Sequence, residues 1–464
     1  MNQALSSVGS QRGFIKETRA LVRLGAPMMA TQFCIMGMGF VDTAMAGHYA
    51  SVDLAGVTLA GFLLWPVFML MTGLTNAITP IVAQLTGAQR VGDSGAIVHQ
   101  GLWVALVTSL VTIAILQNAL RFFEFLSADP EVVEVAVAYL DAVAWGMPPG
   151  MIYVALRYTS EGLGYTRPPM VIAFSALCLN APLNYVLIYG AWGFPELGGE
   201  GCGWATAAVM WFELVLMIRV ARRPFFQRTR LFEQFRWPEA AAISRILKIG
   251  LPIGAAVFME MAVYSVIGFL IAALGTSPQA ANGIAGNINW MTYVLPMSLG
   301  AAAGIRVGFH VGGGDAEGAR HVAMTAMKLS LLYAVSVSVI LVVLRTALVG
   351  IYTTDPAVIA IAVNLLIFIA VYQLVDDAIA TMDGILRGYK DTRVPMVFGL
   401  LGYWLVALPL GHALATGWFG LPAIGVYGYW AGMTIGMLLV VGCLGIRLRR
   451  TTTDRALIRR LALS

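Results

Sequence analysis

Charged residues are scarce in this sequence. Of its 464 residues, 11% are charged and 59% are hydrophobic, whereas a soluble domain has about 25% charged residues. The net charge is +5, and its basic residues gather in loops, where we interpret them as topology determinants and contacts to anionic lipid. The composition therefore excludes an ordinary soluble protein and a nucleic-acid-binding protein, and it predicts a polytopic membrane protein.

Cysteine is also scarce, and common catalytic motifs are absent. The four cysteines have no CxxC or metal-ligand spacing, so we interpret them as small apolar residues; they are Cys34, Cys178, Cys202 and Cys443. The sequence contains no His-Glu-x-x-His zinc motif and no Gly-x-Ser-x-Gly nucleophile elbow, and the glycine run at 312–315 lacks the phosphate-binding lysine. We therefore expect no enzyme activity and no cofactor.

Apolar segments long enough to cross a bilayer recur along the whole chain. We expect no cleavable signal, because residues 1–11 are polar and a full-length span without an A-x-A-like site follows the basic residues 12–23. Hydropathy predicts twelve transmembrane helices, at about 18–46, 53–82, 95–119, 132–160, 168–190, 201–221, 243–273, 281–309, 321–349, 357–386, 394–416 and 422–446.

The lysines and arginines predict the orientation of these spans. With the N-terminus in the cytoplasm, all 29 of them fall in cytoplasmic segments except Arg121, Arg157, Lys328 and Arg345. Such a bias is typical of the positive-inside rule. We therefore expect both termini, and a basic C-terminal tail, in the cytoplasm.

The two halves of the chain repeat each other. The motif at residues 23–27 opens the first span and its counterpart at 248–252 opens the seventh, an offset of 225. An Asp-Pro pair precedes both the fourth span (129–130) and the tenth (355–356), an offset of 226. Each half has six spans, so the halves share one orientation and are related by an axis along the membrane normal. We predict three parts, namely an N-terminal lobe (1–225), a cytoplasmic loop (226–240) and a C-terminal lobe (241–464).

The tenth span carries three carboxylates, which a lipid-facing helix should not contain. Asp376 and Asp383 are seven residues apart and share a helix face with Tyr372, while Asp377 is rotated by about 100°. Each carboxylate would cost roughly 2.5–3.5 kcal/mol near the membrane centre. Ionisable residues within a span therefore indicate a functional site.

A further acid lies within the seventh span. Glu260 has no neutralising residue on its own helix, and Tyr264 one turn later can donate a hydrogen bond to it. Glu260 and Asp376 belong to the same half, so both can face one cavity. Such a cluster can hold a proton or ligate a small hard cation such as Na⁺. The residue types leave both ions open, and they define no certain metal site.

The N-terminal half has a smaller polar set. Asp42 lies late in the first span, and Asn180 and Asn184 share a face of the fifth span around Pro182. They could bind an ion or a substrate. The alternatives are that Asp42 reaches interfacial water and that the asparagines form interhelical hydrogen bonds. A methionine-rich wall elsewhere in the spans would suit varied lipophilic cations.

Several motifs resemble one known family. They keep their order along nearly the whole chain, as GFVDTAMAG (39–47), PLNYVLIYG (182–190), ELGGEGCG (196–203), VLPMSL (294–299), IRVG (305–308) and LRGYKDTR (386–393). In these stretches the chain resembles the bacterial NorM-like branch of the MATE (multidrug and toxic compound extrusion) transporters. The resemblance implies twelve helices in two pseudo-symmetric six-helix lobes that form a V-shaped cleft.

The resemblance also implies a function. It implies secondary antiport of cationic or amphiphilic drugs and dyes, of the fluoroquinolone and ethidium type, against H⁺ or Na⁺ by alternating access. The family's acids and asparagine fall on Asp42, Asn180, Glu260 and Asp376 of this chain. Asp377 and Asp383 are additional carboxylates in the tenth span, which leaves open which aspartate carries the coupling ion.

Other functions fit the sequence less well. A lipid-linked oligosaccharide flippase can share this architecture, but it would need a cationic cleft, and the charges within these spans are mainly acidic. An intramembrane enzyme with an Asp376–Asp383 dyad would not need the twofold repeat. We expect a bacterial inner-membrane antiporter whose partners are small drugs and the lipid bilayer, and which works as a monomer because one chain supplies both lobes.

Overall fold

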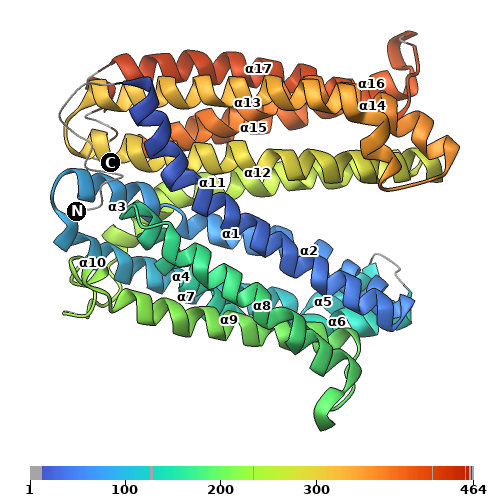
Figure 1. Ribbon diagram of the computed structural model, residues 1–464, viewed down its shortest axis with the longest axis horizontal. Helices are drawn as coiled ribbons and strands as arrows, with labels where there is room; N and C mark the ends of the chain where they lie inside the picture. Colours follow the sequence, from blue (N-terminus) through green and yellow to red (C-terminus); the bar gives the residue numbers. More distant parts are fainter. Residues whose placement is uncertain are drawn as a thin grey trace. The chain divides into compact units, whose positions relative to one another are not determined.

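The computed structural model describes residues 13–125, 129–233, 235–420, 422–454, 456–458 and 461. Every regular element within these ranges is a helix (Figure 1). The helices are α1 (Phe14–Tyr49), α2 (Ser51–Thr75), α3 (Ile78–Gly87), η1 (Val91–Asp93), α4 (Ser94–Leu116), α5 (Ala119–Phe125), α6 (Pro130–Ala144), α7 (Met147–Gly162), α8 (Arg167–Tyr189), η2 (Ala191–Gly193), α9 (Gly199–Ala221), α10 (Pro224–Gln227), α11 (Ala240–Ala272), α12 (Thr276–Gly312), α13 (Ala316–Gly350), α14 (Pro356–Gly388), α15 (Arg393–Leu400), η3 (Leu401–Ala407), α16 (Leu408–Thr416), η4 (Trp418–Gly420) and α17 (Val426–Thr453).

The predicted all-helical polytopic fold is confirmed. Among the described residues, eleven helical segments are long and apolar enough to cross a membrane, and the bent pair of α6 and α7 provides a twelfth span. The predicted spans agree with these helices to within a few residues at most ends. Four of the arginines on which the predicted orientation depends lie outside the described residues, namely Arg12, Arg455, Arg459 and Arg460.

The fourth span differs from the simple hydropathy prediction. Residues 132–160 were expected to form one span, whereas α6 and α7 meet at an angle of 55°. The break falls at Trp145 and Gly146, just before Pro148 and Pro149. Prolines have no amide hydrogen to donate to the preceding turn, so the helix ends there and a new one begins.

The two halves of the repeat begin one pair of corresponding helices, α6 and α14, in the same way. Asp129 accepts a hydrogen bond from the amide of Glu131 at the start of α6. Asp355 accepts one in the same way from Ala357 at the start of α14. Proline occupies the first helical turn in both cases, where its missing amide costs nothing. The repeated Asp-Pro pairs are therefore helix caps.

The chain folds into two compact units. Among the described residues, unit 1 contains residues 13–25 and those from 255 onward, and unit 2 contains residues 26–254. Two helices are thus divided between units, because the first turns of α1 belong to unit 1 and the first turns of α11 belong to unit 2. In unit 1 the start of α1 is held by an ion pair between Glu17 and Arg306 of α12, both buried.

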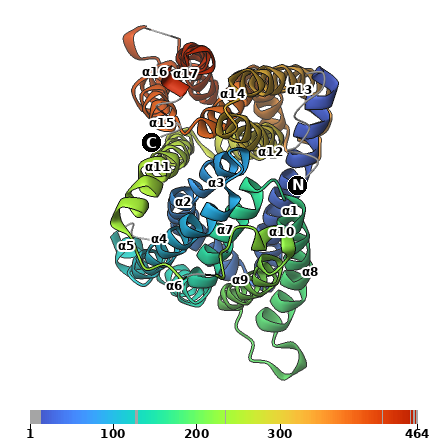
Figure 2. The same cartoon turned by 90° about the vertical axis from the view of Figure 1, so that its left-hand side faces the viewer.

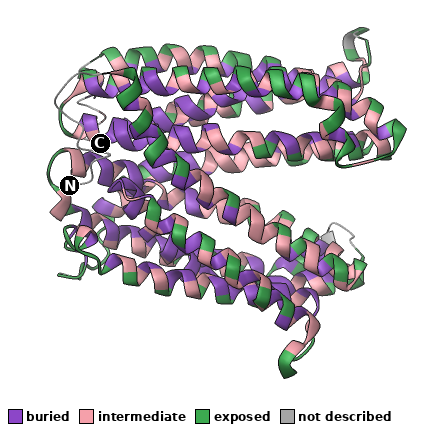
Figure 3. Cartoon of the chain, in the orientation of Figure 1, coloured by how far each residue is buried: buried purple, intermediate pink, exposed green. Residues whose placement is uncertain are grey.

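Within unit 1, α12 and α14 pack with their backbones in close contact. The two helices lie side by side along much of their length (Figures 1 and 2). A Cβ atom at Gly384 would lie 2.2 Å from the backbone of Gly300, and one at Gly304 would lie 2.4 Å from the Gly384 carbonyl oxygen. Small residues permit such approach between membrane helices. Both helices have many buried residues, which Figure 3 colours purple in the orientation of Figure 1. The contact fixes α14, which carries the three aspartates.

We predict that Gly384→Ala destabilises the protein. The added methyl group meets the α12 backbone, which cannot move aside, and overpacking of this kind costs about 1–3 kcal/mol. Thermal unfolding in detergent should show a lower melting temperature. Gly442→Ala in α17 is the control, because nothing lies within 4 Å of its Cβ position, and alanine should there be neutral or stabilising. Equal melting temperatures for the two variants would contradict the prediction.

Candidate functional site

The first candidate site lies in unit 1 and joins side chains of α11 and α14. Asp376 is 3% exposed, and the Tyr372 hydroxyl one turn earlier on α14 donates to its Oδ1 atom at 3.2 Å. The Tyr372 oxygen lies 2.8 Å from the hydroxyl of Tyr264 on α11. Because Tyr372 donates its proton to Asp376, it accepts a hydrogen bond from Tyr264. Two tyrosines therefore connect the tenth-span acid to the helix that carries Glu260.

Glu260 lies one turn before Tyr264 on α11. The Tyr403 hydroxyl donates to the Glu260 Oε1 atom at 3.3 Å, and the rings of Tyr403 and Tyr264 have centroids 6.4 Å apart. Tyr403 comes from η3, a π-helical turn inside the predicted eleventh span, and such turns occur often at functional sites. Asp376, three tyrosines and Glu260 thus form one continuous cluster.

Among the described residues, no cation is paired with this cluster. Glu260 and Asp376 interact electrostatically with each other, and within the described ranges neither forms an ion pair. No group of three or more histidines, cysteines and acids in those ranges could hold a metal ion. The oxygen atoms that face the pair come from tyrosine hydroxyls, which donate hydrogen bonds to carboxylates. These donors stabilise the carboxylates without removing their charge, which a proton, or one cation shared by both carboxylates, would neutralise.

The two additional aspartates of α14 have different surroundings. Asp383 pairs with Arg387 one turn later, at 2.7 Å between Oδ2 and Nη2. Asp377 is fully buried and accepts a hydrogen bond from the Gln373 amide at 2.5 Å. Its other carboxylate oxygen has no partner among the described side chains. Asp376 is thus the one of the three that contacts the tyrosine cluster, as its position one turn after Tyr372 on the same helix face indicated.

The second candidate site lies in unit 2 and joins α1, α8 and α9. Asp42 is 9% exposed, so it does not reach out to interfacial water. Its Oδ1 atom accepts hydrogen bonds from Asn180 at 3.0 Å and Asn184 at 2.6 Å. Its Oδ2 atom accepts one from Thr206 of α9 at 3.3 Å. The three predicted residues are therefore in direct contact, and the carboxylate is held by neutral donors only.

The sequence interpretation missed two residues of these clusters. Tyr403 and Thr206 both lie in predicted spans, but neither is ionisable at neutral pH and neither stands in an obvious motif. The only available signal was a polar side chain within an apolar segment. That signal does not say which helix face the residue occupies, and the π-helical turn around Tyr403 changes that face.

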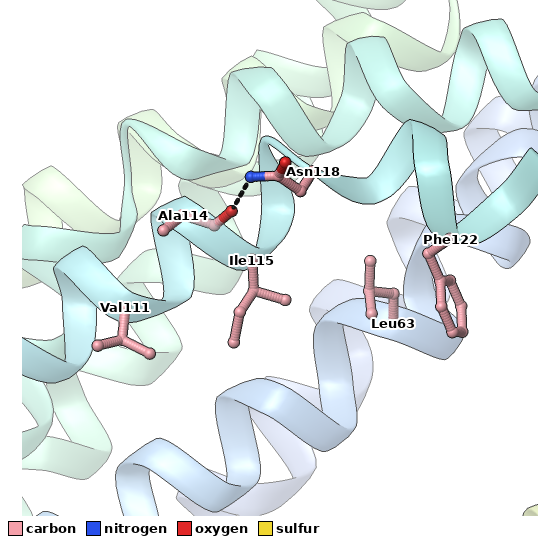
Figure 4. Close-up of a pocket in the computed structure, with 6 residues that line it drawn as sticks. All are labelled: Leu63, Val111, Ala114, Ile115, Asn118 and Phe122. Carbon is pink, nitrogen blue, oxygen red and sulfur yellow. Dashed lines mark hydrogen bonds between the residues drawn. The ribbon is translucent and has the colours of Figure 1, made fainter.

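A pocket of about 450 Å³ in unit 2 is a poor candidate for either site (Figure 4). Its lining is apolar except for Asn118, whose side chain donates to the Ala114 carbonyl oxygen at 2.8 Å. None of the carboxylates described above contributes to it. We therefore assign the candidate functions to the two polar clusters.

Within the described residues, membrane-spanning helices that carry buried polar clusters are typical of a polytopic membrane transporter. The model of the MatE family matches residues 27–186 and again residues 252–412. The second match starts 225 residues after the first, which confirms the internal repeat. The chain belongs to the MatE family, whose members are transporters and not enzymes.

Similar proteins cover almost the whole chain. The multidrug resistance protein PmpM of Pseudomonas aeruginosa is 40% identical over 438 residues, which are 94% of this chain and 92% of that protein. The multidrug resistance protein NorM of Vibrio cholerae is 36% identical over 93% of this chain and 95% of its own length. The crystal structure of the eukaryotic MATE transporter AtDTX14 matches with a TM-score of 0.86 at 18% identity, covering 97% and 99% of the two chains, and supports the same fold.

We predict that Asn184→Ala destabilises unit 2. The Asn184 amide donates to Asp42 and to the Asn180 side-chain oxygen at 3.2 Å, so its loss leaves buried acceptors short of partners. Such losses cost about 1–3 kcal/mol, and thermal unfolding should record them. Asn118→Ala, at an exposed asparagine with one local hydrogen bond, should change little. Unchanged unfolding of Asn184→Ala would exclude an essential structural role for these bonds.

Proposed function

We propose that this protein is a secondary active multidrug antiporter. It exports cationic or amphiphilic drugs and dyes, of the fluoroquinolone and ethidium type, in exchange for H⁺ or Na⁺ by alternating access. The proposal rests on Glu260 and Asp376, two carboxylates within membrane helices that share a tyrosine cluster. Neither forms an ion pair with a cation in the part of the chain that the structure describes. The multidrug resistance relatives support the drug substrates.

In this mechanism the coupling ion binds at Glu260 and Asp376. An empty pair carries negative charge in a region of low dielectric, which is unfavourable, and a cation or proton removes that cost. The tyrosine hydroxyls can turn between donating and accepting, so they can adapt to either state. Ion binding therefore favours one conformation of unit 1, and drug binding favours the ion-free conformation.

An ion gradient provides enough energy for such exchange. A membrane potential of 100 mV is worth about 2.3 kcal/mol per charge. A proton gradient of one pH unit adds about 1.4 kcal/mol. Export of a monovalent drug cation costs about 2.3 kcal/mol of this against the potential. One proton per cycle therefore leaves about 1.4 kcal/mol, enough for a tenfold drug gradient, and two leave about 5.1 kcal/mol, enough for between three and four orders of magnitude.

The cluster around Asp42 is the proposed second site, for a drug cation or an ion. Its carboxylate is satisfied by amide and hydroxyl donors without a positive charge. A bound cation therefore supplies the charge that the cluster lacks. Asp383 has a cation already, in Arg387, and we assign it a structural role within the ion-binding half.

We also propose the cellular setting. The protein lies in the bacterial inner membrane with both termini in the cytoplasm, as the distribution of lysine and arginine predicts. It functions as a monomer, because one chain provides both the Glu260–Asp376 cluster and the Asp42 cluster.

The first test compares acid-to-amide variants in proteoliposomes loaded with ethidium. Glu260→Gln and Asp376→Asn should each reduce gradient-driven transport at least tenfold at normal expression, because each loses a charge that the ion neutralises. Asp383→Asn is the matched control on α14 and should retain most transport. Normal transport by both Glu260→Gln and Asp376→Asn would refute the proposed ion site.

A second test identifies the coupling ion. A pH gradient and a Na⁺ gradient are imposed separately on the wild-type protein, with ethidium or a fluoroquinolone as the substrate. Transport under a pH gradient alone assigns proton binding to the carboxylates, and transport under a Na⁺ gradient alone makes their oxygens Na⁺ ligands. If neither gradient moves either compound, the proposed antiport is wrong for these substrates.

A further inference from the structure

A ring of hydrogen bonds around Asp377 joins α12, α13 and α14 within unit 1. The Gln373 amide donates to the Asp377 Oδ1 atom at 2.5 Å, and the Gln373 Oε1 atom accepts from the Thr292 hydroxyl at 3.0 Å. The Tyr333 hydroxyl donates to the Thr292 backbone carbonyl at 2.8 Å. The Ser330 hydroxyl closes the ring by donating to the Asp377 backbone carbonyl at 3.0 Å. The ring includes no residue of the tyrosine cluster, so it forms a separate polar region.

Two oxygen atoms beside this ring have no hydrogen-bond partner among the described residues. They are the Oδ2 atom of Asp377 and the hydroxyl oxygen of Thr381, one turn later on α14, and both residues are fully buried. A buried threonine in a helix commonly donates to the carbonyl four residues earlier, as Thr31 and Thr159 do in this protein. For Thr381 that carbonyl belongs to Asp377 and accepts from Ser330 instead. The Thr381 hydroxyl therefore stays available to another group.

The two unpartnered oxygens lie on one face of α14. Residues four apart on a helix have Cβ atoms about 5–6 Å from each other, yet no hydrogen bond joins the Asp377 carboxylate to the Thr381 hydroxyl. Buried polar atoms nearly always have a partner. One further atom between these two oxygens would satisfy both of them.

The neighbouring helix α12 is interrupted beside them. Pro296 has no amide hydrogen, so it leaves the Thr292 carbonyl without its usual helical donor, and the Tyr333 hydroxyl takes that place. Four residues before Pro296, Thr292 contacts Gln373. Four residues after it, a Cβ atom at Gly300 would lie 2.5 Å from a backbone oxygen of α14. The interrupted turn thus lies beside the α14 segment that carries the two oxygens, and its carbonyl oxygens have lone pairs to offer.

The chemistry of these oxygens restricts what can bind there. Asp377 forms no ion pair with any described residue, and an isolated carboxylate is costly within a span. A proton would remove the charge but would leave the Thr381 hydroxyl without a partner. A divalent metal prefers several carboxylates, and no group of three or more acids, histidines and cysteines in the described ranges could hold one. A small monovalent cation both neutralises the carboxylate and binds the hydroxyl oxygen.

We propose that the Asp377 Oδ2 atom and the Thr381 hydroxyl oxygen are ligands of one Na⁺ ion between α12 and α14. The Gln373 amide holds the other carboxylate oxygen and so orients Oδ2 toward the ion. Carbonyl oxygens of the interrupted α12 turn complete the ligand set, as unwound helix turns do for Na⁺ in other transporters. The site is distinct from the Glu260–Asp376 cluster, and ion binding to it does not depend on the proposed antiport.

Binding of radioactive Na⁺ to the purified protein tests the proposal. The Glu260→Gln/Asp376→Asn double variant serves as the background, because it lacks the other candidate Na⁺ site of unit 1. Na⁺ should still bind in this background. Adding Thr381→Val removes the hydroxyl and keeps the shape, so it should weaken Na⁺ binding at least tenfold, the loss that removal of even a supporting group causes at metal sites. Thr381→Ser keeps the hydroxyl and should bind as the background does. No Na⁺ binding in the background, or equal binding with valine and serine, would overturn the proposal.

Melting temperatures in detergent keep the test decisive if the valine variant is unstable. A ligand that binds only the folded state raises the melting temperature, so Na⁺ should raise that of Thr381→Ser relative to choline at equal ionic strength. Thr381→Val and Asp377→Asn, each in the same background, should lose this rise. The same rise in all three variants would contradict the proposal, and so would protection of Thr381→Ser by acidic pH but not by Na⁺. These measurements need neither drug nor gradient, so a failure of drug transport would count against the proposed function alone.

Discussion

The cost of an unpaired carboxylate inside a membrane span is the constraint on which the rest of this structure depends. Some acids in the helices meet this constraint with an adjacent cation. Arg306 pairs with Glu17 and Arg387 pairs with Asp383. Such pairs are electrically neutral, so they can hold helices together without binding anything else. Acids without a cation must obtain neutrality from a proton, an ion or a substrate.

By this criterion the structure separates structural acids from ion-binding acids. Glu260 and Asp376 have tyrosine donors, and Asp42 has amide and hydroxyl donors. Neutral donors stabilise a carboxylate without removing its charge, so the site stays available to a cation. Unit 1 stabilises its carboxylates with tyrosine hydroxyls and unit 2 with asparagine and threonine side chains, although the sequence repeat gives both units matching helix caps. The repeated caps thus specify where helices begin, and the polar side chains that differ between the units specify what each unit binds.

The spans, the repeat and several site residues could be predicted from the sequence. Hydropathy and the placement of charges are properties of whole helices, so they do not depend on how one helix is rotated against another. The twelve spans and the repeat follow from apolar length and from recurring Asp-Pro caps. The sequence also predicted Glu260, Asp376 and Asp42 as candidate residues, since acids are rare in spans. The ion pair of Asp383 with Arg387, four residues later on the same helix, could also have been predicted from spacing. The contact of Tyr403 with Glu260 could not. That contact depends on helix rotation and on a π-helical turn, neither of which changes the hydropathy.

The most direct test of the account is a binding competition at equilibrium, without any gradient. Ethidium affinity for the purified protein would be measured as the proton or Na⁺ concentration is raised, in the wild type and in a Glu260→Gln/Asp376→Asn double variant. The account predicts that the coupling ion weakens ethidium binding to the wild type and has no effect on the double variant. The same ion dependence in both proteins would contradict the claim that ion and drug compete through these two carboxylates.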